Sequence, residues 1–141
     1  MTSFKVQKHI DIKASKEKVW DALTNPMVIK KYLFGTEAIS DWKVGSTLIF
    51  RGEFDRQEYA DKGIIQRFDV GEIFQYTYLS SFSGLEDKDE NYHLITYTLE
   101  LMHKGVSLHL KHENIQDEKA QKHAYENWDF VLKEIKEIVE K

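Results

Sequence analysis

The C-terminal segment 117–141, DEKAQKHAYENWDFVLKEIKEIVEK, constrains the fold of this chain more than any other stretch. Its apolar residues recur at helical spacing, and Asp117 is a good N-cap at its start. A helix of roughly 24 residues extends about 36 Å. The rest of the chain must therefore supply an apolar surface of similar length. The predicted buried stripe consists of Ala120, Ala124, Trp128, Val131, Leu132, Ile135, Ile138 and Val139.

Alternating apolar and polar residues between positions 36 and 113 predict that this surface is an antiparallel sheet. The alternation is clearest in STLIFRGEF, GIIQRFDVGEIFQYTYLS and YHLITYTLELMHKGVSLHLKHENI. Turns are expected at Val70-Gly71 and Lys104-Gly105, and Gly52 predicts a bulge or a sharp bend. The polar segment 80–91 predicts a surface loop. Upstream, FKVQKHIDI predicts a first strand.

Two short helices are predicted in VWDALTNPMVIKKYLFG, which follows the first strand. Ser15 can cap the first helix, and Pro26 suits the first position of the second because its missing N–H would be unpaired there. Neither helix is long enough to be stable alone. Since a straight helix cannot fill a curved sheet, we expect the pair to close one end of the remaining space. The closing residues would be Trp20, Leu23, Ile29 and Leu33.

Composition narrows the class of protein. With 141 residues the chain is predicted to form a single domain spanning 1–141, either as a monomer or as a homodimer. The net charge of -4, with Lys and Arg scattered along the sequence, argues against nucleic acid as a partner. No segment is apolar for long enough to span a bilayer or to act as a signal peptide. The absence of cysteine fits a reducing compartment, so we expect a cytoplasmic protein.

Several segments, in their order along the chain, resemble the AHSA1-like branch (activator of Hsp90 ATPase homologue) of the START/Bet v 1 (SRPBCC) superfamily. They are IDIKASKEKVWDALTNPMVIKKYLFG, SDWKVGSTLIFRGEF, KGIIQRFDVGEIFQYTY, ITYTLEL, VSLHLKH and NWDFVLKEIK. The resemblance implies an α+β helix-grip fold, in which a curved antiparallel sheet surrounds a long C-terminal helix and leaves an internal cavity. The superfamily includes lipid carriers, hormone receptors, small-molecule cyclases and the C-terminal domain of an Hsp90 ATPase activator.

The inward-facing positions of the predicted sheet and terminal helix form the candidate ligand site. Each of these large residues, taken alone, is ordinarily a core residue. As a set they are typical of a small-molecule pocket, which has apolar walls and a few convergent polar groups. The tyrosines bring hydroxyls that need partners when buried. The predicted ligand-binding residues are Phe50, Phe54, Phe74, Tyr76, Tyr78, Tyr97, Leu99, Leu110, His112, Trp128 and Leu132.

Six histidines raise the question of a metal or an acid–base site. His109 and His112 point to opposite faces of one strand and cannot chelate a metal together, and no His-Glu-x-x-His spacing occurs. We therefore expect no metal, no cofactor and no catalytic residue. His112 is the exception to consider, because the alternation directs it inward, where it could act as an acid or a base.

Three functions follow from these patterns. The leading hypothesis is the binding of a small hydrophobic or amphipathic ligand between the sheet and the C-terminal helix, without catalysis. The first alternative is a cyclase- or hydrolase-like enzyme of the same superfamily, using His112 or a tyrosine. The second is an interaction module linked to an Hsp90-type chaperone, although the sequence holds no counterpart of the activator's separate N-terminal domain.

Overall fold

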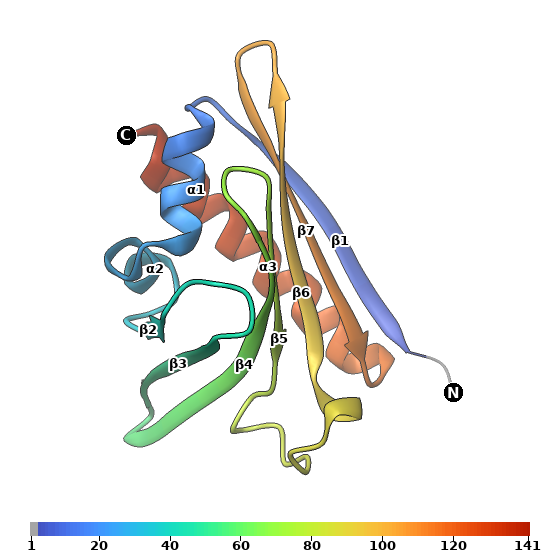
Figure 1. Ribbon diagram of the computed structural model, residues 1–141. Coiled ribbons are helices and arrows are strands. Elements are labelled where there is room, and N and C mark those ends of the chain that lie inside the picture. Colours follow the sequence, from blue (N-terminus) through green and yellow to red (C-terminus); the bar gives the residue numbers. More distant parts are fainter. Residues whose placement is uncertain (1–2) are drawn as a thin grey trace.

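The computed structural model describes residues 3–141, so residues 1 and 2 of the expected domain lie outside the described part. The elements follow one another in the predicted order (Figure 1). They are β1 (Phe4–Ile12), α1 (Lys16–Thr24), α2 (Pro26–Tyr32), β2 (Glu37–Ser40), β3 (Thr47–Phe54), β4 (Gln57–Asp69), β5 (Ile73–Tyr78), the short 3₁₀ helix η1 (Asp89–Asn91), β6 (His93–Met102), β7 (Gly105–Ile115) and α3 (Glu118–Glu140).

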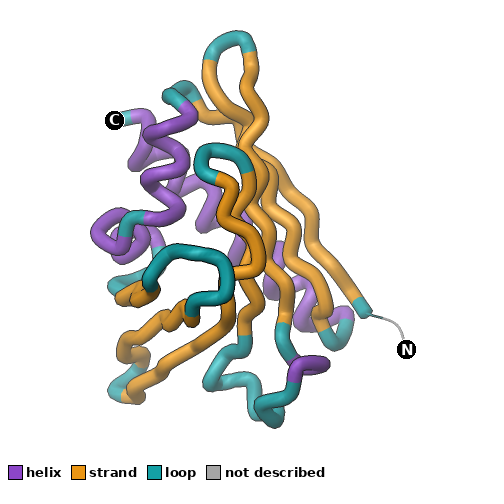
Figure 2. Tube along the Cα trace, viewed as in Figure 1, coloured by secondary structure: helices purple, strands orange, loops and turns teal. Residues whose placement is uncertain are grey.

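The strands form one 7-stranded antiparallel sheet in the order β1-β7-β6-β5-β4-β3-β2. Since β1 and β2 lie at opposite edges, α1 and α2 carry the chain from one edge to the other. α3 runs behind the sheet in the view of Figure 1, and Figure 2 shows α1 beside its C-terminal end. This is the predicted helix-grip fold, with a curved sheet, two short helices after the first strand and a long C-terminal helix.

The face that α3 turns toward the sheet is the predicted apolar stripe. Asp117 accepts a hydrogen bond from the backbone N–H of Ala120 at 2.8 Å, which begins the helix. The space between this stripe and the concave face of the sheet is called the trough below. Neither α3 nor any other helix of the described chain is long and apolar enough to cross a membrane. The buried members of the stripe are Trp128, Val131, Leu132, Ile135 and Val139.

α3 also covers the free edge of β1. The side chain of Gln121 donates a hydrogen bond to the carbonyl of Lys5 at 2.8 Å, and that of Lys136 donates to the carbonyl of Asp11 at 2.6 Å. Unpaired backbone groups on an edge strand can otherwise recruit a strand from another chain. The helix therefore protects this edge as well as covering the core.

The short helices begin and end where the sequence predicts. Ser15 accepts from the backbone N–H of Lys18 at 3.1 Å, and Asn25 both ends α1 and caps α2. The ring of Trp20 packs edge-on against those of Phe68 and Phe74, with centroids 5.3 and 6.2 Å apart. The pair thus packs onto the sheet through its apolar side. Trp20, Leu23 and Ile29 are buried, and Leu33 is half-buried.

The β3–β4 hairpin corrects the prediction for Phe54 and one of the two alternatives for Gly52, the bulge. Phe54 is 70 % exposed, because it lies directly before the two-residue turn at Asp55-Arg56, where the hairpin extends past the buried core. Phe54 follows the inward alternation of its strand, but no other part of the described chain covers its side chain. Gly52 forms no bulge, since it pairs with Tyr59 in unbroken register. A Cβ at Gly52 would lie 2.6 Å from the Tyr59 hydroxyl, so glycine leaves room for this ring.

Candidate functional site

Apart from Phe54, the predicted ligand-binding residues lie on the concave face of the sheet or on the buried side of α3. Tyr78, on β5, is half-buried. Strand alternation and the helical stripe together account for these positions. The remaining members of the predicted set are buried: Phe50, Phe74, Tyr76, Tyr97, Leu99, Leu110, His112, Trp128 and Leu132.

Aromatic rings form a continuous cluster across the trough, from β3 to α3. The Phe50 and Tyr76 centroids are 5.7 Å apart, and those of Phe74 and Tyr76 are 5.1 Å apart. On the far side, Tyr97 meets Trp128 nearly edge-on at 6.0 Å. Such pairs add about 0.5–1.5 kcal/mol beyond the area that they bury. The rings touch one another, so a bound molecule would have to displace some of these contacts.

Three tyrosines are buried within this apolar surrounding. They are Tyr32 on α2, Tyr76 on β5 and Tyr97 on β6, and they are called the tyrosine cluster below. Tyr32 donates to the carbonyl of Ala22 at 2.8 Å. Burial raises the pKa of Tyr76, and the neighbouring Tyr97 partly offsets this effect. Burial, followed by the nearby Tyr76, also raises the pKa of Tyr32 and of Tyr97.

The tyrosine cluster is therefore protonated and uncharged at neutral pH. Tyr32 is not among the predicted ligand-binding residues. Its place beside Tyr76 depends on how α2 docks against the sheet, and no spacing in the sequence reveals this.

A second polar group ties α3 to β6 and β7 at one end of the trough. The indole N–H of Trp128 donates to Nδ1 of His112 at 2.9 Å, and Nε2 of His112 lies 2.7 Å from Nδ1 of His93. Because an indole N–H can only donate, His112 must carry its proton on Nε2 and donate it to His93. Nε2 of His93 in turn lies 3.2 Å from the side-chain oxygen of Gln116. These four residues are called the histidine relay.

The two imidazole rings of the histidine relay are uncharged at neutral pH. Burial, and then the neighbouring His93, lowers the pKa of His112 to about 3. Burial also lowers the pKa of His93. Sequence reasoning missed His93 because it lies diagonally from His112, whose direct partner across the strands is Ile95. Among residues 3–141, no group of three or more His, Cys, Asp or Glu side chains is placed to hold a metal ion.

A third polar group lies where β4 meets the loop after β5. Asp61 is only 7 % exposed and accepts hydrogen bonds from the Tyr78 hydroxyl at 2.5 Å and the Ser81 backbone N–H at 2.8 Å. Nearby, the hydroxyls of Thr36 and Tyr59 share a hydrogen bond. Asp61 was missed because it stands among charged residues that suggest a solvated strand end. Its contacts fix the start of the exposed loop to the sheet.

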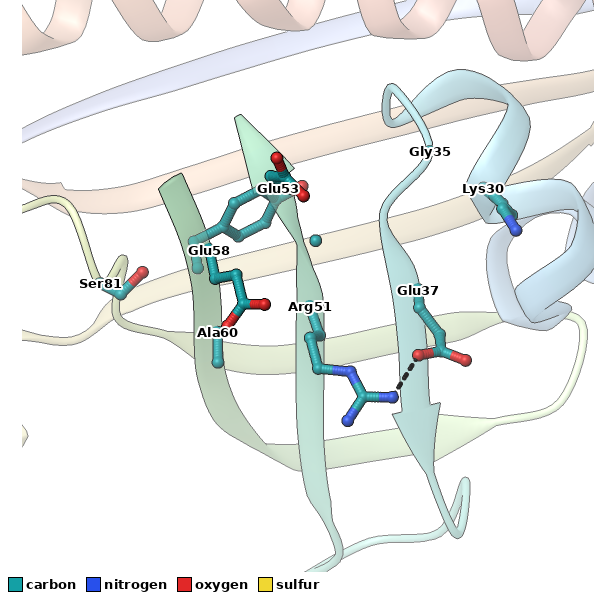
Figure 3. A pocket seen from close by; sticks show the side chains of 10 residues that line it. Lys30, Gly35, Glu37, Arg51, Glu53, Glu58, Ala60 and Ser81 are labelled. Atoms are coloured by element: carbon teal, nitrogen blue, oxygen red, sulfur yellow. Dashed lines mark hydrogen bonds and ion pairs between the residues drawn. The ribbon is translucent and has the colours of Figure 1, made fainter. Parts of the chain in front are cut away.

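A surface hollow of about 740 Å³ is lined by residues of α2, β2, β3 and β4 (Figure 3). Arg51 and Glu37 lie on its wall and are joined by an ion pair of 2.6 Å. Arg51 pairs across the strands with Ala60, whereas the neighbouring Phe50 pairs with the buried Asp61. Directly paired residues share a face of the sheet. Arg51 and Ala60 therefore lie on the outer face, whereas the lining residues Gly52 and Tyr59 share the face of Phe50. The groove thus reaches both faces of the sheet, and none of the predicted ligand-binding residues lines it.

The smaller hollow, about 320 Å³, lies between the end of α2 and the middle of α3. Its rim carries Phe34 and Phe130, whose rings stack with centroids 5.7 Å apart and planes 12° apart. Phe34 is 71 % exposed and has a φ of 55°, which is uncommon for a residue other than glycine. The lining residue Asn127 directly precedes the buried Trp128. The lining residues of α3 are themselves exposed, so the hollow opens to solvent at the surface of that helix.

Solved structures place the fold in a known class. A protein described as ChR145 from Cytophaga hutchinsonii is 43% identical, with a TM-score of 0.85, over 97% of this chain and 94% of that one. The Aha1 dimer from Colwellia psychrerythraea has a TM-score of 0.78 at 19% identity, over 97% and 96% of the two chains. Ara h 8.0201 has a TM-score of 0.78 at 10% identity, over 98% of each chain. The fold is that of the START/Bet v 1-like superfamily.

A match to a sequence family assigns the chain more narrowly than its fold does. A sequence model of the family described as "Activator of Hsp90 ATPase homolog 1-like protein" matches residues 13–140. The chain therefore belongs to the AHSA1 family. A comparison with curated protein sequences finds no match.

Proposed function

We propose that this protein binds a small, mostly apolar molecule in the trough and catalyses no reaction. The observation that carries this proposal is the tyrosine cluster. A buried hydroxyl costs free energy unless it is hydrogen-bonded, and phenylalanine would fill the same space without that cost. Three hydroxyls buried among apolar side chains are the kind of polar group by which small-molecule sites orient a ligand.

The α2–α3 hollow is the proposed opening to the trough. It lies beside the end of α2, which has only 7 residues, too few to be stable without its contacts. Parting the exposed Phe34–Phe130 stack would release the end of α2 from α3. A guest could then reach Tyr32, on the buried side of α2, and the rest of the tyrosine cluster.

The acid–base alternative has weaker support. Both ring nitrogens of His112 are engaged within the histidine relay. A ring with a pKa of about 3 is also poorly matched to proton transfer near neutral pH. A chaperone-linked role has only the family name in its favour. We therefore propose a binding protein of the cytoplasm, a location that fits the absence of cysteine.

Titration with two small probes, indane and 1-indanone, tests the proposal. We expect at least one of them to shift the ¹H–¹⁵N resonance of the Trp128 indole, because that N–H lies in the trough. Replacing Phe130→Ala should increase the association rate about tenfold, since it removes half of the stack at the opening. Tyr125→Ala is the matched control, because Tyr125 lies on the same helix but packs with Lys8 on β1.

Two results would overturn the proposal. The first is the absence of any resonance shift with either probe at 1 mM, the upper end of usual small-molecule affinities. The second is a set of resonance shifts confined to the groove around Glu37 and Arg51. If Phe130→Ala and Tyr125→Ala change the association rate equally, the proposed opening is wrong.

A further inference from the structure

Strand β3 continues past the end of its pairing with β2. The two strands pair as far as Arg51, whereas β3 runs on to Phe54. The segment Gly52–Phe54 therefore has β4 on one side and, within the described chain, no strand on the other. The groove of Figure 3 lies along this free edge, because Gly52 and Glu53 line it.

The peptide groups of Glu53 point toward the free side of the strand. A two-residue turn follows Phe54, which therefore hydrogen-bonds to Gln57. Hydrogen-bonded and non-hydrogen-bonded pairs alternate along an antiparallel ladder, so Glu53 and its partner Glu58 form a non-hydrogen-bonded pair. The N–H and C=O of Glu53 thus face away from β4, at a position that β2 does not reach. An open strand edge of this kind can recruit another strand.

The same pair of residues brings two carboxylates together on the outer face of the sheet. Side chains of a non-hydrogen-bonded pair lie closest, and like charges directly opposite each other destabilise a sheet. Neither Glu53 nor Glu58 forms an ion pair within residues 3–141. The neighbouring Arg51 is bound to Glu37 at 2.6 Å, and Lys30 lies on α2, on the far side of β2 (Figure 3). The free edge therefore combines an open hydrogen-bonding position with two unpaired negative charges.

We propose that the groove binds an extended peptide segment that carries a lysine or an arginine. The peptide adds to β3 as a short strand, and one of its residues exchanges hydrogen bonds with Glu53. Directly paired residues share a face of the sheet, so the side chain of that residue lies beside the two carboxylates and is basic. Its neighbours in the peptide point to the other face, where Phe54 is 70 % exposed, and are apolar.

A second copy of this chain fits the free edge less well than a basic peptide. Two-fold pairing of the edge with itself would bring both copies of Glu53 and Glu58 together. Like charges across neighbouring strands are destabilising, so the second copy would add to the repulsion that a lysine or an arginine removes.

Titration of peptides into the ¹⁵N-labelled protein tests the proposal. The probe is acetyl-Thr-Val-Lys-Val-Thr-amide, and the matched probe has glutamate in place of lysine. We expect the lysine peptide to shift the backbone ¹H–¹⁵N resonance of Glu53 and to bind about tenfold more tightly than the glutamate peptide. The double variant Glu53→Gln/Glu58→Gln should reduce this ratio of affinities to about twofold or less. Glu126→Gln/Glu137→Gln removes two exposed carboxylates from α3 and is the control, which should keep the ratio.

N-methylation of the peptide tests the hydrogen bonds without changing the protein. In the proposed pairing the N–H of the lysine faces Glu53, whereas the N–H of the following valine faces away from β3. Methylating the lysine nitrogen should weaken binding about tenfold, the effect of one lost hydrogen bond. Methylating the valine nitrogen is the control and should change the affinity about twofold at most.

Three results would overturn the proposal. The first is an unshifted Glu53 resonance at about 5 mM lysine peptide, where even a complex with a Kd of about 1 mM is mostly formed. The second is an equal affinity for the lysine and glutamate peptides, or an equal effect of the two methylations. The third is a dimer of the free protein in which the Glu53 amide exchanges slowly with solvent, since a second copy would then occupy the edge.

Discussion

Between pH 7 and pH 4, the wild type should lose about 3 kcal/mol more unfolding free energy than the variant His112→Gln. In the unfolded chain a histidine titrates near 6.5, whereas burial and His93 hold the folded pKa of His112 at about 3. The unfolded state therefore binds the proton first. The stability contributed by neutral His112 is complete above pH 6.5 and is lost as the pH falls toward 3. Each unit in this window corresponds to about 1.4 kcal/mol.

Chemical denaturation at pH 7, 6, 5 and 4 measures this difference. The glutamine amide can accept from Trp128 and donate to His93, so the variant keeps the hydrogen bonds and loses only the titration. His123→Gln, on an exposed side chain of α3, is the control and should follow the wild type. If the unfolding free energies of the wild type and His112→Gln fell by the same amount between pH 7 and pH 4, the buried, neutral state of His112 would be contradicted.

Trp128→Ala should lower the unfolding free energy by about 4 kcal/mol at pH 7. The change removes a buried ring from the trough, for which large-to-small substitutions typically cost about 3–5 kcal/mol. It also leaves Nδ1 of His112 without its donor. The measurement is urea denaturation followed by circular dichroism, since the variant loses one tryptophan emission.

Tyr125→Ala provides the matched control for this substitution. It removes an aromatic ring of similar kind from the same helix, but Tyr125 is 53 % exposed and contacts Lys8 at the surface. Its expected loss is below about 1 kcal/mol. A loss for Trp128→Ala no larger than that of the control would show that the tryptophan does not lie in the trough.

The sequence was sufficient for the fold because its strongest signals are local. The caps at Ser15, Asn25 and Asp117 and the stripe of α3 depend on neighbours a few residues away. Strand alternation predicts which face of the sheet a side chain lies on. It does not predict how far along the strand the core covers that face. Phe54 therefore follows the inward pattern and is still exposed, because the hairpin tip lies past the core.

The polar part of the site was harder to predict than its apolar walls. Tyr32 joins Tyr76 only when α2 docks on the sheet, and His93 meets His112 only in the register that pairs Ile95 with His112. Asp61 becomes buried because Tyr78 and Ser81 fold over it. Each contact joins segments whose relative placement depends on sheet curvature and helix docking. The spacing of residues along the sequence does not reveal sheet curvature or helix docking.

The position of a bound probe tests the central claim most directly. Intermolecular nuclear Overhauser effects can be recorded between 1-indanone and the isotope-labelled protein. The account predicts contacts from the probe to both the Trp128 indole and the Tyr76 ring, since both belong to the aromatic cluster of the trough. Contacts only with exposed residues, such as Phe34 or Arg51, would place the ligand outside the trough and contradict the account.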